Sequence, residues 1–169
     1  MHQMLMTALG TVCAVFATIG TVTAMSIDIT VDRLFDICEA PAVSVVAQKG
    51  DELGWRRLTD AETQEWHTSF VAYNGGSVEI VGWQREEAGK LESLSFWIAV
   101  GPNGHTACAY STEGPSEFLG ALSERLGPPD NFDRNDAVET ISASWIRGAT
   151  QYSFVQVGSR ILVNIGTGG

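Results

Sequence analysis

Short alternating segments joined by tight turns constrain this fold more than any other feature of the sequence. Residues 91–100 place apolar side chains at every second position, which is the spacing of a strand with one buried face. The turn Gly101-Pro102-Asn103-Gly104 follows directly; Pro presets its first residue and Gly accepts a positive φ. Residues 105–111 then return as a second strand. Because strands joined by so short a turn must be antiparallel, the sequence predicts an antiparallel sheet.

The same strand pattern occurs on both sides of one amphipathic helix. Pro115 precedes this helix and Gly127 ends it. Its apolar stripe would consist of Phe118, Leu119, Leu122 and Leu126. We expect three strands before the helix and three after it, at residues 77–85, 91–100, 105–111, 141–147, 151–157 and 160–165.

Three further helices are expected before the first of these strands. Thr30 can cap a helix over residues 31–38, and Pro41 can start a helix over residues 42–48 that ends at Gly50. Thr59-Asp60-Ala61-Glu62 is a capping box for a third helix, which would end at Asn74-Gly75-Gly76. These elements predict an α+β fold of two layers, in which N-terminal helices precede antiparallel meander strands around one amphipathic helix (βββ-α-βββ).

Two segments are expected to lack regular structure. The acidic stretch 130–136 reads as a solvated loop, and the glycine-rich tail 166–169 as a frayed end. The acidic stretch has oxygen ligands for calcium, but an EF-hand frame starting at Asp133 fails at Ala137. We therefore predict no metal site.

The first 24 residues differ from the rest of the chain. All 30 charged residues lie after Ala24, and the leading segment is apolar and ends in Val22-Thr23-Ala24, a small-residue pattern typical of signal peptidase sites. We expect residues 1–24 to be a signal peptide and residues 25–169 to form a single domain that is periplasmic or secreted. Two alternatives stay open. The segment could be a retained membrane anchor, or translation could start at Met25 and give a cytosolic protein.

The cysteines agree with export. Removal of residues 1–24 removes Cys13 and leaves Cys38 and Cys108 as an even pair, which in an oxidising compartment would form one disulfide. Cys38 also falls on the apolar face of the first predicted helix, as a structural disulfide requires. Two buried free thiols are the alternative.

Charge and missing motifs exclude several functions. A net charge of −10 argues against binding to nucleic acid or to anionic membranes, and it favours a basic protein or a cationic ligand as partner. The chain has no nucleophile elbow, no phosphate-binding glycine loop and no zinc-ligand spacing, so no cofactor is predicted.

Two histidines are the only candidates for general-base chemistry near neutral pH. His67 and His105 are the histidines that follow Ala24, and each would need a carboxylate such as Glu65. Nothing in their spacing shows that they meet. The sequence therefore favours a non-enzymatic binding, inhibitor or accessory protein, and a small hydrolase-like enzyme is the alternative.

Three strand tryptophans are the candidates for a binding surface. Trp97 lies on the opposite face of its strand from Phe96, and Trp83 and Trp145 lie in two other strands. A tryptophan on the second face of a sheet either packs under another element or lines a binding surface. In the second case the rim of the patch would be acidic, formed by Glu79, Glu86, Glu87 and Glu92.

Overall fold

The structure is a computed structural model, which describes residues 27–114 and 117–168. The predicted signal peptide, Cys13 and Pro115 lie outside the described residues.

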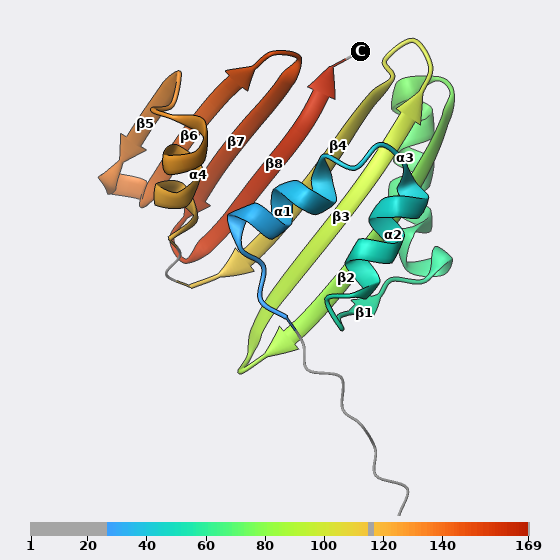
Figure 1. Cartoon of the computed structure of the whole chain (residues 1–169), viewed down its shortest axis with the longest axis horizontal. Coiled ribbons are helices and arrows are strands. Elements are labelled where there is room, and N and C mark those ends of the chain that lie inside the picture. The colour runs from blue at the N-terminus through green and yellow to red at the C-terminus, as the bar shows by residue number, and fades with distance from the viewer. Residues whose placement is uncertain (1–26, 115–116, 169) are drawn as a thin grey trace, which may run out of the picture.

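Eight strands form one antiparallel sheet in the order β1-β2-β3-β4-β8-β7-β6-β5 (Figure 1). Their bounds are β1 (Arg56–Arg57), β2 (Ser77–Glu87), β3 (Lys90–Val100), β4 (His105–Glu113), β5 (Asn131–Asn135), β6 (Thr140–Arg147), β7 (Thr150–Val157) and β8 (Arg160–Gly168). The meanders β2–β4 and β6–β8 meet where β4 pairs with β8. The predicted α+β class and the antiparallel meanders are confirmed.

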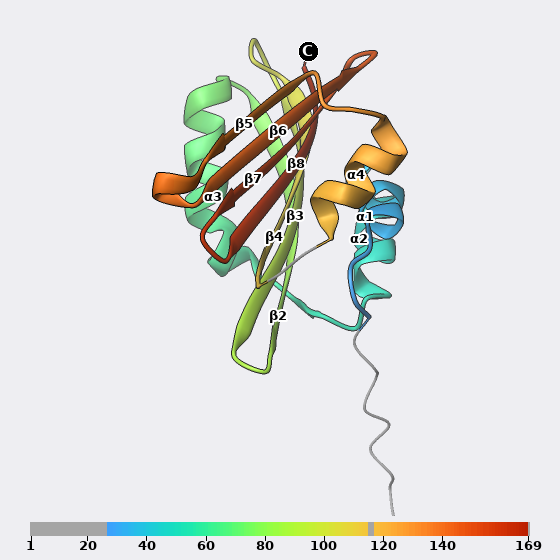
Figure 2. The same cartoon turned by 90° about the vertical axis from the view of Figure 1, so that its left-hand side faces the viewer.

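The helices divide unequally between the two faces of the sheet. They are α1 (Val31–Cys38), α2 (Val43–Asp51), α3 (Asp60–Asn74) and α4 (Phe118–Leu126), and a short 3-10 helix, η1, covers Asp136–Val138. Figure 2 shows α1, α2 and α4 on one side of the sheet, called here the helical face, and α3 alone on the other, called here the open face. None of the described helices is long and apolar enough to cross a lipid bilayer.

The core lies under α1, α2 and α4. Trp83, Phe96 and Trp145 are fully buried there, and α4 contributes the fully buried Leu122. Burial of such side chains is the main stabilising contribution in a domain of this size.

The predicted helix caps are present. The Thr30 side chain accepts a hydrogen bond from the backbone N–H of Arg33, and Thr59 and Glu62 form the full capping box. Hydrogen bonds from Arg56 and from Thr59 lower the pKa of Glu62 to about 2. The helix α3 ends at Gly75, whose positive φ of 66° is the left-handed conformation that glycine adopts without a Cβ penalty.

A disulfide joins Cys38 at the end of α1 to Cys108 in β4, with the Cα atoms 5.4 Å apart. Both cysteines are buried. The bridge therefore fixes α1 to the centre of the sheet.

The prediction that residues 130–136 form a loop was wrong. Asn131–Asn135 form the edge strand β5, which pairs with β6 from Asn131 opposite Ser144 to Asn135 opposite Thr140. All five residues of β5 are exposed, so no apolar alternation marks the strand. Backbone pairing alone places it in the sheet.

The prediction of a frayed glycine-rich tail was also wrong up to Gly168. Gly166 pairs with Ala107 of β4 on one side and with Gln151 of β7 on the other. Since β8 has a neighbouring strand on each side, its backbone donors and acceptors are used in both directions. This pairing orders the tail.

The helix α2 does not end at Gly50, as predicted, but continues to Asp51. A Cβ at Gly50 would lie 2.1 Å from Cζ2 of Trp83, so the glycine is required by close packing and not by a helix end. Trp83 Nε1 also donates to Asp51 Oδ1 at 2.9 Å.

We expect Gly50→Ala to lower the free energy of unfolding by about 2 kcal/mol, because the added methyl group must displace a fully buried indole. Gly120→Ala is the matched control, since Gly120 lies in α4 with nothing within 4 Å of its built Cβ. The control should be neutral or stabilise by up to about 1 kcal/mol, because alanine is the better helix former. Urea unfolding of both variants measures the difference in their free energies of unfolding. Equal values would show that the Trp83 ring moves to make room for the methyl group at no cost.

Candidate functional site

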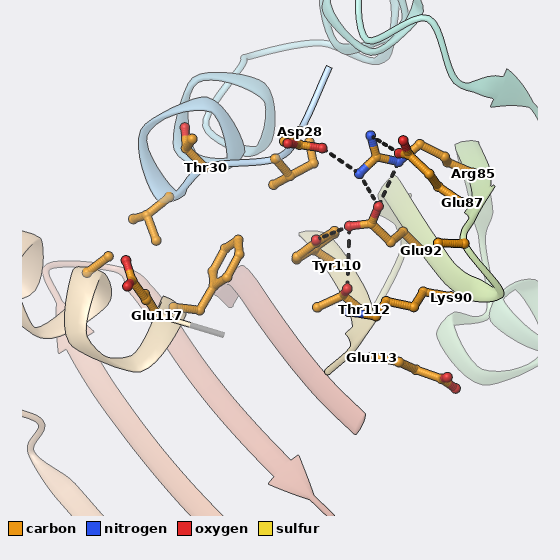
Figure 3. A pocket seen from close by; sticks show the side chains of 15 residues that line it. Asp28, Thr30, Arg85, Glu87, Lys90, Glu92, Tyr110, Thr112, Glu113 and Glu117 are labelled. Carbon is orange, nitrogen blue, oxygen red and sulfur yellow. Dashed lines mark hydrogen bonds and ion pairs between the residues drawn. The ribbon is translucent and has the colours of Figure 1, made fainter. Parts of the chain in front are cut away.

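A cavity of about 710 Å³ opens on the helical face (Figure 3). It lies between the segment that leads into α1, the start of α4 and the hairpin end of β2 and β3. Charged and apolar side chains both line it, so it combines an ion network with an apolar wall.

Arg85 is the centre of the ion network. It donates to Glu92 through Nε at 2.7 Å and through Nη2, and it forms ion pairs with Asp28 at 2.8 Å and Glu87 at 3.2 Å. Its guanidinium also lies 4.9 Å from the ring centroid of Trp55. Burial alone would lower the pKa of Arg85, but the hydrogen bonds to Glu92 and Asp28 outweigh it and raise that pKa. Arg85 is therefore a permanent cation in a fixed position.

Glu92 is fixed from the opposite side. Tyr110 donates to Glu92 Oε1 at 2.6 Å, and Thr112 donates to the same oxygen at 3.4 Å, as Figure 3 shows. Burial, with the hydrogen bond to Glu92, raises the pKa of Tyr110, so the phenol stays protonated and continues to donate. The Glu92 side chain is only 12% exposed, and Arg85 is 10% exposed. The network is thus a rigid, largely desolvated base for the cavity.

The rest of the cavity is more acidic than basic. Glu113 pairs with Arg160, which is not one of the lining residues, at 3.2 Å. Within the described part of the chain, the side chains of Glu117 and Lys90 make no hydrogen bond or ion pair. The lining therefore holds five carboxylates and two cations, a formal charge of −3. The carboxylates are Asp28, Glu87, Glu92, Glu113 and Glu117, and the cations are Arg85 and Lys90.

An apolar wall faces these charges. Ile29 lies in the segment that leads into α1, Val31 is the first residue of α1, and Phe118 and Ala121 come from α4. The Phe118 ring lies 5.1 Å from that of Tyr110. A ligand in the cavity would therefore meet carboxylates on one side and an apolar, partly aromatic surface on the other.

The expected tryptophan patch divides between the two faces of the sheet. Trp83 and Trp145 are fully buried in the core of the helical face and have no contact with solvent. Trp97 is half-buried on the open face, where its ring stacks on Phe70 of α3 with centroids 5.0 Å apart. Here it lines a groove of about 370 Å³, called the aromatic groove. Its lining residues are Trp66, Ser69, Phe70, Ser93, Ser95, Trp97, Ala109, Ser111 and Leu162.

The expected acidic rim around Trp97 was wrong. Side chains alternate along a strand, so Glu92 shares the helical face with Leu94 and Phe96 and points away from Trp97. Glu87 joins Glu92 in the cavity, and neither Glu79 nor Glu86 lines the aromatic groove.

Neither histidine lines the cavity or the aromatic groove. His67 and Glu65 are exposed on α3. His105 lies beside Trp97, whose indole N–H donates to His105 Nε2 at 2.9 Å. Because an indole nitrogen only donates, His105 carries its proton on Nδ1, which donates to the Asn103 carbonyl at 3.0 Å. His105 thus positions Trp97, and the enzyme hypothesis gains no geometric support from either residue.

No group of three or more metal-ligating side chains occurs within residues 27–114 and 117–168.

The sequence reasoning missed the Arg85–Glu92 pair, although a signal for it exists. A turn at residues 88–89 places Arg85 directly opposite Glu92 in the β2–β3 register. The partners Asp28 and Tyr110 come from distant segments and become visible only in the folded chain.

Comparison with known proteins gives no family for this chain: no family model matches it, and no curated protein and no solved structure matches it significantly.

Proposed function

We propose that this protein is a non-enzymatic binding domain whose cavity on the helical face takes a small cation with an apolar body. The observation that carries the proposal is the charge imbalance of one cavity, five carboxylates against two cations. Arg85 is already shared among three of those carboxylates, and Arg160, which lies outside the lining, pairs with Glu113; counting Arg160 as well leaves a net charge of −2. A cationic group supplied by a ligand would reduce this repulsion.

The apolar wall narrows the ligand class further. A small inorganic cation would leave the part-exposed Phe118 and Ala121 facing water, whereas an amine on an aromatic or aliphatic body would cover them. The rigid Arg85–Glu92–Tyr110 network needs no rearrangement on binding, which lowers the entropic cost of association. The net charge of −10 would also draw such a cation toward the protein.

The proposal includes action outside the cytoplasm, in the periplasm or after secretion. The apolar, uncharged residues 1–24 and the disulfide between Cys38 and Cys108 support export.

The binding proposal is tested with 2-phenylethylamine as probe and 2-phenylethanol as its uncharged counterpart. Isothermal titration calorimetry should show binding of the amine and much weaker binding of the alcohol. Glu117→Gln should weaken amine binding about two- to fivefold, because it removes an exposed carboxylate of the cavity.

Glu65→Gln is the matched control, since it removes the same charge from an exposed position on α3 and should leave the affinity unchanged. Failure of the amine to bind would overturn the proposal. Equal binding of the alcohol would show that the carboxylates do not contribute to binding. If the two variants weaken binding equally, the amine is attracted only by the overall charge of the protein and not by the cavity.

A further inference from the structure

The aromatic groove on the open face is independent of the cavity, because the sheet separates the two. One wall is α3, which supplies Trp66 and Phe70 four residues apart and therefore on one side of the helix. The floor consists of short side chains from β3 and β4. The helix α3 packs mainly against β2 and β3 and is alone on this side of the sheet, so it leaves much of the open face uncovered (Figure 2).

The aromatic rings of the groove are held in place before any ligand binds. Phe70 stacks on Trp97, and the hydrogen bond to His105 fixes the far edge of the same indole. Trp66, in contrast, is 41% exposed. The exposed Trp66 ring, beside the two fixed rings, therefore offers a surface on which a ligand ring can stack.

Hydroxyl groups line the floor. Ser93 Oγ and Ser111 Oγ lie 2.8 Å apart, and Ser95 Oγ donates weakly to the Ala109 carbonyl at 3.5 Å. Each hydroxyl can donate one hydrogen bond and accept two, so these bonds leave acceptor positions free. The floor can therefore bind polar groups of a ligand.

No charged side chain lines the groove or belongs to the cross-strand row described here, and the nearest charges along β4 and β8 are those of the Glu113–Arg160 ion pair, two residues beyond Ser111 and Leu162. None of the groove's lining residues is charged, in contrast to the seven charged residues of the cavity. The cross-strand row that begins at Ser95 and Ala109 continues through Asn164, Ser153 and Ser144, all short, polar and uncharged. On a protein of net charge −10, this part of the open face suits a neutral ligand.

We propose that the aromatic groove binds a pyranose ring of an uncharged oligosaccharide, whose further rings extend over the row from Asn164 to Ser144. A charged ligand would find no counter-charge there, and a purely apolar one would strip water from the serine hydroxyls without replacing its hydrogen bonds. A pyranose presents C–H groups on its faces and hydroxyls around its rim. It therefore matches both the aromatic wall and the hydroxyl-lined floor.

The test uses neutral tetrasaccharides of glucose and of N-acetylglucosamine as probes, with saturation-transfer NMR to detect binding and calorimetry to measure affinity. We expect at least one of them to bind. Trp66→Ala should weaken that binding at least tenfold through loss of the exposed stacking surface. Tyr73→Ala is the matched control, because Tyr73 is an aromatic residue on the same helix, 73% exposed and outside the groove, and its removal should leave the affinity unchanged.

Three results would overturn the proposal. The first is binding of none of the tetrasaccharides by the folded protein, and the second is equal loss in both variants. The third is self-association of the protein, detected by sedimentation, if the Trp66→Ala variant no longer associates. That result would mean that the groove binds a second copy of the chain. The amine titration of the helical face is a separate measurement, so either proposal can fail without the other.

Discussion

Reduction of the disulfide between Cys38 and Cys108 is expected to lower the free energy of unfolding by about 4 kcal/mol. The bridge closes a loop of 70 residues, and the chain-entropy model assigns roughly this value to a loop of that length. Small domains are stable by only about 5–15 kcal/mol in total, so the reduced protein should lose a large share of its stability. The loss arises mainly in the unfolded chain, which gains conformations once the link is broken.

Denaturant unfolding with and without a phosphine reductant at neutral pH measures this loss. The variant carrying Cys38→Ala and Cys108→Ala should behave like the reduced protein, apart from the small volume that its two buried sulfur atoms leave empty. If the oxidised and reduced proteins unfold at the same denaturant concentration, the bridge contributes nothing and the loop is held by packing alone.

Removal of Arg85 is expected to cost about 3 kcal/mol of stability. Arg85→Met leaves Glu92 in place with a side chain only 12% exposed and without its cation, and an uncompensated buried charge is strongly destabilising. Replacing both residues, with Arg85→Met and Glu92→Leu together, removes that orphaned carboxylate. The double variant should therefore be more stable than Arg85→Met alone, although Tyr110 then loses its acceptor.

The matched control for this prediction is Arg134→Met. Arg134 forms an ion pair with Asp136 at 3.0 Å, but both side chains are exposed, so its loss should cost less than about 1 kcal/mol. Urea unfolding of the three variants gives the comparison. An Arg85→Met variant no less stable than Arg134→Met would show that water already screens the network.

Local sequence signals predicted those elements whose causes are themselves local. Thr30 and the Thr59–Glu62 box start helices through hydrogen bonds to residues three positions away, and Gly75 ends one through its own backbone conformation. The turn at residues 101–104 set the β3–β4 hairpin in the same way. The α+β class followed from such elements taken in order.

Elements that depend on a distant neighbour were mispredicted. β5 exists because β6 offers its free edge, and the exposed residues of β5 carry no pattern that reveals this. Gly50 suggested a helix end when considered alone, but the Trp83 ring explains it as a packing contact inside the helix. The same limit applied to the cavity, since Asp28, Glu92 and Tyr110 are far apart in the chain and only β2–β3–β4 pairing and the entry into α1 bring them together.

The sequence by itself determined the acidic charge and the order of the four α-helices and of six of the eight strands, and it favoured the pairing of Cys38 with Cys108, because composition, local capping and an even cysteine count suffice for these. Only the tertiary structure decided on which face each tryptophan and each carboxylate lies. That choice depends on strand register and on which helices cover the sheet, since both faces of these strands carry large side chains. Register and helix coverage together place the charged cavity on one face of the sheet and the uncharged aromatic groove on the other. These are the two binding surfaces proposed for this protein.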